Sequence, residues 1–167
     1  MRRKVAKSEA GWRPEMWAQF AELGLLGASF SEDEGGFGGG PIEAMIISEE
    51  FGKGLVIEPY LQTVIVGGNL LRFGGSAAQK EEHIAGLIGG ENIFAFAASE
   101  PKSRFDFNDV STTAKKDGAG YVLNGQKAYI TNPGSDISSF AIVLVVTSPP
   151  SCAPVAAIVP PPSRCVN

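Results

Sequence analysis

The sequence predicts an α+β chain in which an N-terminal helical bundle, residues 1–92, precedes an incomplete antiparallel β-barrel, residues 93–167. Two observations predict this order. Apolar residues recur at helical spacing before residue 92, whereas β-branched residues, alternation and turn dipeptides dominate after it. A doubly wound nucleotide-binding fold would alternate strands and helices along the whole chain, so the sequence argues against that class.

Three helices have clear ends in the first half. A proline or serine at the start and glycines at the end delimit them: Pro14 to Gly24, Pro41 to Gly52 or Gly54, and Ser76 to Gly89 and Gly90. Gln79 lies three residues after Ser76 and completes a capping box with it. A further apolar segment, residues 61–75, is interrupted by Gly67 and Gly68.

The second half carries short runs that are typical of strands. They are "NIFAFAAS" at 92–99, "VSTTAKK" at 110–116, "FAIVLVV" at 140–146 and "APVAAIV" at 153–159. The dipeptide Asn124-Gly125 stands between two more strand-like runs. Because Asn-Gly is the strongest short-range signal for a β-hairpin, we predict a hairpin turn at this dipeptide.

Composition and charge exclude several classes of protein. With 44% apolar and 19% charged residues, the chain is typical of a globular protein. A net charge of −4 argues against nucleic-acid binding, and no apolar stretch approaches the ~20 residues that span a membrane. Its two cysteines, Cys152 and Cys165, form no metal-binding or redox motif, so we expect no metal site and a cytoplasmic location.

The glycine-rich stretch "SEDEGGFGGGP", residues 31–41, resembles a phosphate loop only superficially. A dinucleotide fingerprint requires a third glycine where Pro41 stands, and it follows a strand, which is missing here. The acidic residues 32–34 would also repel a phosphate. We therefore predict that this stretch is a turn between two packed helices.

Three segments together resemble the acyl-CoA dehydrogenase family of flavoproteins. Residues 17–54 resemble its N-terminal helical domain, "FAFAASEP" at 94–101 resembles the start of its middle β domain, and residues 112–132, ending in "NGQKAYITN", resemble a hairpin of that domain. The resemblance covers about residues 12–147. The combination of "SRFD" and "EPYLQTVIVGG" is most similar to the small subunits of pimeloyl-CoA dehydrogenase-type enzymes.

The resemblance implies an FAD site in the second half of the chain. Phe96, Ala98 and Ser99 stand where the family lines the isoalloxazine ring and donates hydrogen bonds to its edge. Tyr129 replaces the family's tryptophan, and Thr131 stands at the position of a threonine near the reactive flavin nitrogen. In this interpretation the protein orients and tunes the ring, and the cofactor carries out the redox chemistry.

The chain departs from the family at one phosphate-binding motif. The family commonly has Glu-Pro-x-x-Gly-Ser-Asp, and this chain has "EPKSRFD" at residues 100–106. Phe105 therefore stands where a serine helps to hold the flavin pyrophosphate, and Asp106 retains the motif's last position. We predict that Arg104 supplies a charge-assisted contact to phosphate instead. Lys102 and Lys127 are alternative cations.

The resemblance also implies what the chain does. Intact relatives oxidise an acyl-CoA to the trans-2-enoyl-CoA, and their catalytic carboxylate belongs to a third, helical domain, which we expect to be absent here. We assign no catalytic residue: Glu100 and Asp106 are not the base, and His83, beside Glu81 and Glu82, is expected to be a surface histidine. We expect the chain to be inactive alone and to form a homo- or hetero-oligomer with another acyl-CoA dehydrogenase-like chain.

Two alternatives remain open from the sequence. One is a flavin-dependent monooxygenase or nitroalkane oxidase on the same fold, since the residues that separate these reactions lie outside the chain. The other is a non-catalytic remnant that acts as a binding or assembly module. The proline-rich tail, residues 147–167, departs from the family after Ile158-Val159-Pro160, and a truncated or shifted reading frame would account for it.

Overall fold

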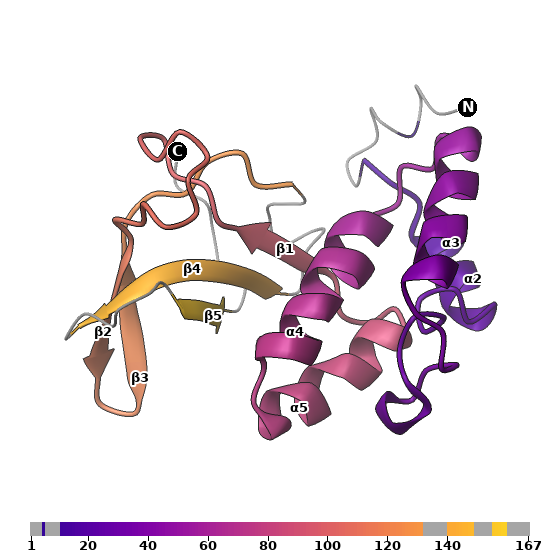
Figure 1. Cartoon of the computed structure of the whole chain (residues 1–167), viewed down its shortest axis with the longest axis horizontal. Helices are drawn as coiled ribbons and strands as arrows, with labels where there is room; N and C mark the ends of the chain where they lie inside the picture. The colour runs from indigo at the N-terminus through magenta and orange to yellow at the C-terminus, as the bar shows by residue number, and fades with distance from the viewer. Residues whose placement is uncertain (1–4, 6–10, 132–139, 149–154, 160–167) are drawn as a thin grey trace. The chain divides into compact units, whose positions relative to one another are not determined.

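The computed structural model describes residues 5, 11–131, 140–148 and 155–159. The chain divides into two compact units, Met1–Phe94, which is helical, and Ala95–Asn167, which contains the sheet (Figure 1). The two cysteines and the tail from residue 160 lie outside the described residues.

The helical unit is built from four main segments. They are α2 (Pro14–Glu22), α3 (Pro41–Gly54), the π-helical η2 (Leu61–Gly67), which continues into α4 (Gly68–Gly74), and α5 (Ala77–Ile88). The predicted starts at Pro14 and Pro41 are confirmed. The capping box is also confirmed: the Gln79 N–H donates to Ser76 Oγ at 3.3 Å, and the Ser76 N–H donates to Gln79 Oε1 at 2.9 Å.

Gly67 and Gly68 do not interrupt their helix. Both have right-handed helical backbone angles, and the helix runs through them. A Cβ at Gly67 would lie 2.7 Å from the Cβ of Phe94, and one at Gly68 would lie 2.6 Å from Cζ of Phe30. The predicted interruption is therefore wrong, because close packing against these two rings requires glycine and outweighs its low helix propensity.

One face of α5 is buried and carries the single histidine. His83 is only 5% exposed, like Ile84 and Leu87 on the same helix. Its ring packs edge-on against Phe94, with the centroids 6.1 Å apart. The prediction of a surface histidine is wrong: the neighbouring Glu81 and Glu82 face solvent, while His83 belongs to the apolar stripe.

The glycine-rich loop after α2 satisfies its own backbone. A short 3₁₀ turn, η1 (Glu32–Glu34), begins it. Each N–H from residue 35 to residue 39 donates to a backbone carbonyl of residues 27–32, at 2.8–3.2 Å. The Gly40 N–H donates to Glu43 Oε2 at 2.7 Å. Since a phosphate cradle needs unoccupied N–H groups, the loop is a joint between helices, as its sequence predicts.

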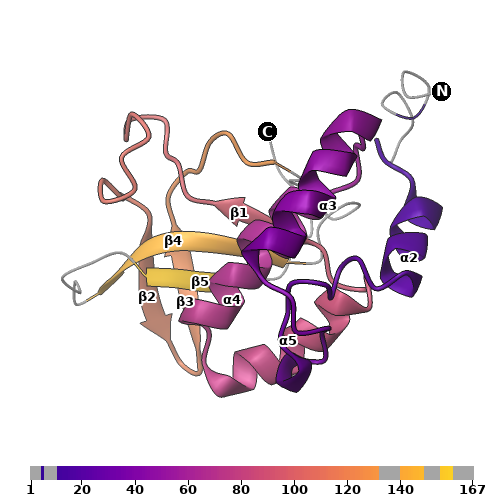
Figure 2. The ribbon, with the colours of Figure 1, turned by 45° about the vertical axis from the view of Figure 1, so that its right-hand side comes forward.

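The second unit is a small β region. Its strands are β1 (Phe94–Ala97), β2 (Thr113–Asp117), β3 (Gly120–Asn124), β4 (Phe140–Ser148) and β5 (Val155–Val159), in the order β1-β4-β2-β3 with β5 paired to β4. Figure 2 shows β4 as the long central strand. The predicted fold class, helices followed by a small β region, is confirmed. One detail differs: β2 pairs with β4 in parallel, whereas β2/β3 and β4/β5 are antiparallel.

The hairpin turn lies elsewhere than predicted. β2 and β3 are joined at Gly118-Ala119, between the paired residues Asp117 and Gly120. Gly125 instead follows the end of β3, where a Cβ would lie 2.6 Å from Cα of Thr112. The Asn124-Gly125 hairpin is therefore wrong: this glycine serves close backbone packing, and the turn uses Gly118, whose φ is 57°.

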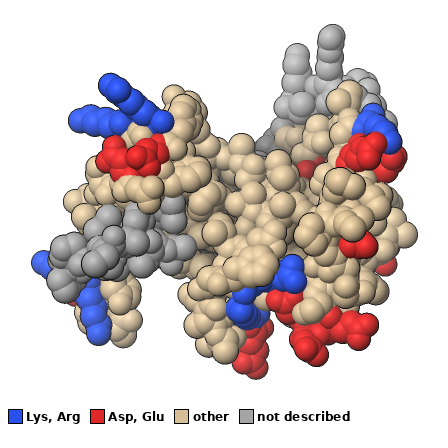
Figure 3. Space-filling view, viewed as in Figure 1, with Lys and Arg blue, Asp and Glu red and all other residues tan. Residues whose placement is uncertain are grey.

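Charge is distributed unequally between the units. Residues 1–94 carry 13 Asp and Glu against 8 Lys and Arg, and residues 95–167 carry 5 against 6. On the face shown in Figure 3, acidic side chains gather at the lower end of the helical unit. An anionic ligand is therefore repelled less by the β region. No helix in the described part of the chain is long and apolar enough to cross a membrane.

Candidate functional site

Two segments of the β unit are joined beside β1. The Ala128 N–H donates to the carbonyl of Ser99 at 2.9 Å. Lys127 Nζ donates to the carbonyl of Ala98 at 3.1 Å and to Glu100 Oε1 at 2.8 Å. The segment that follows β1 and the segment that follows β3 therefore lie side by side, although about 28 residues of sequence separate them.

Glu100 is the centre of a buried network. Its carboxylate, in a residue only 7% exposed, also accepts hydrogen bonds from Thr112 Oγ1 at 2.6 Å and from the N–H groups of Thr112 and Ser111 at 2.9 Å. Burial by itself would raise the pKa of Glu100. The bonds from Lys127, Thr112 and Ser111 outweigh it and lower the pKa from its ordinary 4.5 to about 2.

This network defines what Glu100 and Lys127 can do. A carboxylate that holds its charge so strongly is a poor proton acceptor, which agrees with the prediction that Glu100 is not the base. The Lys127 side chain is 7% exposed and already neutralises Glu100. Its predicted role as an alternative cation for phosphate is therefore wrong.

Exposed aromatic rings flank the joined segments. Tyr129 is 79% exposed and Phe105 is 68% exposed, and their ring centroids are 5.5 Å apart with the planes tilted by 37°. Phe96, half-buried on β1, has its ring 6.4 Å from that of Phe107. Aromatic pairing contributes only about 0.5–1.5 kcal/mol beyond burial, so these rings gain little from each other.

The backbone near these rings is strained. Arg104, Phe105 and Tyr129 have φ angles of 48°, 66° and 56°, which lie in the left-handed region. For a residue with a Cβ this conformation costs about 1–2 kcal/mol. Such strain is typically found at ligand-binding and catalytic sites, where the surrounding structure holds it. Arg104 stands where the family pattern has glycine, which adopts left-handed angles without strain. The loop therefore has a backbone conformation that suits glycine at this position.

The predicted site residues are only partly brought together. Ala98 is buried, Ser99 is half-buried, and both adjoin the segment that carries Tyr129. Arg104 is exposed and directly precedes Phe105, whose ring contacts that of Tyr129. The remaining three are not brought to these residues by any contact: the ring of Phe96 lies beside that of Phe107, Thr131 is exposed at the end of its described segment, and Asp106 Oδ1 accepts from the Asn108 N–H at 2.9 Å.

Sequence reasoning missed two features of this site. The Glu100–Lys127 ion pair joins residues 27 positions apart, and no local pattern indicates their contact. Phe105 looked only like a lost hydrogen-bond donor. The available signal was its position in the motif. Phe105 stands where the family has a small serine, so a large ring there was expected to protrude.

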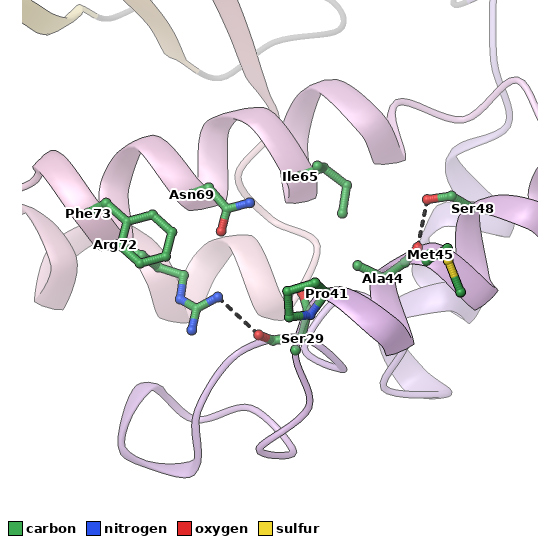
Figure 4. A pocket seen from close by; sticks show the side chains of 10 residues that line it. Ser29, Pro41, Ala44, Met45, Ser48, Ile65, Asn69, Arg72 and Phe73 are labelled. Carbon is green, nitrogen blue, oxygen red and sulfur yellow. Dashed lines mark hydrogen bonds between the residues drawn. The ribbon is translucent and has the colours of Figure 1, made fainter.

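The helical unit contains a groove of its own. A groove of about 440 Å³ separates α3 from η2 and α4, and Met45, Ile65, Asn69, Arg72 and Phe73 are among the residues that line it (Figure 4). Arg72 donates to the carbonyl of Ser29 at 3.0 Å and pairs with Glu34 at 3.0 Å. Its charge is thus already neutralised, so the groove is chiefly an apolar surface.

The residues of the β unit fit a flavin cofactor. A flat ring needs an apolar or aromatic wall and polar donors at its edge, and Tyr129 with Phe105 offers the wall while the Ser99 hydroxyl is a donor. Within the described residues, no carboxylate lies within 4 Å of the Arg104 guanidinium, which leaves it available to a phosphate.

Comparisons with known proteins match both halves of the chain to one family. The family model of the acyl-CoA dehydrogenase N-terminal domain matches residues 1–91, and that of the acyl-CoA dehydrogenase middle domain matches residues 95–164. A probable acyl-CoA dehydrogenase of Bacillus subtilis (strain 168) is 42% identical over 128 residues, which are 75% of this chain and 21% of that protein. The chain thus spans about a fifth of this curated relative's length.

Solved structures give the same result. An acyl-CoA dehydrogenase from Bacillus anthracis, complexed with FAD, is 32% identical with a TM-score of 0.77, over 88% of this chain and 25% of that one. A chain of the ChsE4–ChsE5 complex from Mycobacterium tuberculosis is 26% identical with a TM-score of 0.79, over 95% of this chain and 42% of that one. This chain therefore belongs to the acyl-CoA dehydrogenase family and covers the N-terminal and middle domains of that family.

Proposed function

We propose that this chain is the flavin-binding part of an FAD-dependent acyl-CoA dehydrogenase that converts an acyl-CoA to the trans-2-enoyl-CoA. One observation carries the proposal: Lys127 and Ala128 hold the Ser99 segment beside the exposed ring of Tyr129. When bound, FAD would accept the hydride that leaves the β-carbon of the substrate. We place residues 1–92 and 93–167 as the two domains and assign the pimeloyl-CoA subtype on "SRFD" and "EPYLQTVIVGG".

Each site residue has a proposed role that follows from its chemistry. Phe96 and Ala98 supply the apolar wall, and Tyr129 supplies an aromatic face. The hydroxyl groups of Ser99 and Thr131 donate hydrogen bonds to the edge of the ring. Arg104 contacts phosphate, and Asp106 shapes the turn that presents it through its bond to the Asn108 N–H.

The proposed reaction needs a catalytic base, and Glu100 does not suit that role. The α-proton must pass to a carboxylate whose pKa suits the working pH, and Glu100, with a pKa of about 2, is committed to its buried network. We therefore propose that the chain alone does not turn over acyl-CoA and that residues outside it, in a further domain or a partner chain, provide the base.

The proposed partner is a second acyl-CoA dehydrogenase-like chain. Along α3, Ile42, Met45 and Ile46 are all more than half exposed, and α3 has no buried residue. Such a contiguous apolar face is typical of an interaction surface. The solved ChsE4–ChsE5 relative is itself a complex.

Gel filtration of this chain mixed with the proposed partner tests the surface. Ile46→Lys should abolish association with the partner, whereas Glu81→Lys, the control at an exposed site on α5, should not. Equal association of both variants contradicts this surface.

A coupled assay tests the proposed reaction. The chain is incubated with FAD, an electron acceptor and a panel of acyl-CoAs, with and without a complete family member from the same source. We expect enoyl-CoA to form only in the mixture and at a rate above that of the family member alone. If the mixture instead catalyses oxygen-dependent hydroxylation or nitroalkane oxidation, the chain belongs to another reaction of the fold. If the rate of enoyl-CoA formation in the mixture equals that of the family member alone, a non-catalytic remnant is favoured.

A further inference from the structure

The exposed Phe105–Tyr129 pair is poorly explained by folding alone. Both residues hold left-handed backbone angles, and both rings remain more than two thirds exposed. Neither burial nor their mutual contact offsets this strain. Glycine, which lacks a Cβ, would relieve it, so a side chain at position 105 is retained at a cost to the stability of the free chain.

The geometry of the pair restricts what can cover it. A planar ligand inserted between two rings needs them parallel and about 7 Å apart, which is twice a van der Waals contact of about 3.5 Å. Here the centroids are 5.5 Å apart and the planes are tilted by 37°. A ligand therefore cannot lie between the rings and must stack on their outer faces.

The surroundings favour an anionic ligand with a flat ring. Arg104 and Lys102, both exposed, lie on the same loop as Phe105. The β unit also lacks the negative excess of the helical unit. Aromatic rings beside an available guanidinium match a nucleotide, in which a flat heteroaromatic ring is attached to phosphate.

We infer that Phe105 and Tyr129 together form a stacking platform for a heteroaromatic ring of the dinucleotide cofactor. Phe105 thus offers ring stacking in place of the phosphate hydrogen bond that a serine would make. This inference rests on the proposed flavin site, to which it adds Phe105 as a ring contact.

Titration calorimetry with riboflavin, ADP and FAD tests the inference. Riboflavin carries the flavin ring without diphosphate, and ADP carries the adenine ring with it. We expect riboflavin to bind the wild-type chain and Phe105→Gly to weaken its binding at least tenfold, since a stacked ring is typically worth that factor. Phe105→Trp should retain binding because it keeps the ring. A loss confined to ADP would assign the platform to adenine.

The glycine variant separates a binding role from a structural one. Glycine relieves the left-handed strain at position 105, so thermal unfolding should occur at a higher temperature while ligand affinity falls. Phe107→Ala is the control, since Phe107 is an exposed phenylalanine that contacts Phe96 instead. If Phe105→Gly binds riboflavin and ADP as the wild type does, or if the wild type binds neither, the inference is wrong.

The same experiments distinguish failure of the stacking platform from failure of the proposed dehydrogenase function. Phe105-dependent riboflavin binding with no acyl-CoA oxidation in any mixture would retain the platform and reject the dehydrogenase. Acyl-CoA oxidation with FAD that is unaffected by Phe105→Gly would retain the dehydrogenase and reject the platform. Protection of Phe105 and Tyr129 by a partner chain, without ring binding, would also reject it.

Discussion

Lys127 Nζ lies 2.8 Å from Glu100 Oε1, and both side chains are 7% exposed. This buried ion pair joins the two segments that carry the proposed flavin contacts. Because Glu100 accepts three further hydrogen bonds from Ser111 and Thr112, its charge is compensated in the folded state. Together with the bond from the Ala128 N–H to the Ser99 carbonyl, the pair holds the Ser99 and Tyr129 segments side by side.

Removing Lys127 should destabilise the β unit selectively. Lys127→Met leaves a buried carboxylate without its cation, which typically costs about 3–5 kcal/mol. Hydrogen exchange should increase sharply at the Ala128 amide. Trp12 and Trp17 both lie in the helical unit, so their fluorescence should change little. The control is Lys116→Met, at an exposed position of β2.

A double variant checks that the effect comes from the pair. Glu100→Gln combined with Lys127→Met removes both charges, so we expect it to be less destabilised than the sum of the two single variants. Strictly additive losses would contradict a direct coupling between these residues.

The stability of the β unit should depend on Glu100 at acidic pH. Its pKa in the folded chain, about 2, is below the ordinary 4.5, so its contribution is complete above pH 4.5 and is lost as the pH falls toward 2. Amide exchange of β-unit residues at several pH values between 5 and 2 measures this loss. Glu100→Gln should have a weaker dependence, and identical slopes would show that Glu100 contributes nothing.

Arg104→Gly should change stability and affinity in opposite directions. Glycine accepts the φ of 48° at that position, so the β unit should gain about 1 kcal/mol. Loss of a charge-assisted phosphate contact, worth about 1.5–3 kcal/mol, should weaken FAD binding roughly tenfold or more. Riboflavin, which has no phosphate, should bind unchanged, and unchanged FAD affinity would reject the phosphate role of Arg104.

Gly125 should not tolerate a side chain. A Cβ there would lie 2.6 Å from the backbone of Thr112, the residue that bonds Glu100. Gly125→Ala should therefore cost about 1–3 kcal/mol through overpacking. Gly120→Ala, in the same unit with its nearest contact at 3.9 Å, should be neutral or slightly stabilising. Equal unfolding midpoints for the two variants would contradict this packing.

Local signals in the sequence predicted most helix ends correctly. Pro14, Pro41 and the Ser76–Gln79 capping box act through their own backbone, so neighbouring residues are enough to recognise them. The errors concern residues whose role depends on distant contacts. Gly67 looked like an interruption because Phe94, its packing partner, is 27 residues away.

The same reason limits prediction of the site. Asn124-Gly125 has a hairpin composition, but Thr112 packs where the side chain of residue 125 would be, and the turn forms at Gly118-Ala119. His83 looked exposed because its neighbours are charged, although the helical period places it in the core. Family motifs indicated Ser99 and Tyr129, but only the fold reveals that Lys127 joins their segments.

Absorption spectroscopy of the purified chain tests the central claim most directly. The chain is mixed with excess FAD, passed through a desalting column, and its visible spectrum is recorded beside that of Lys127→Met treated in the same way. We predict that the wild-type chain retains flavin absorption and that the variant retains much less. A wild-type chain that emerges colourless, while its β unit is folded by circular dichroism and hydrogen exchange, would contradict the flavin site.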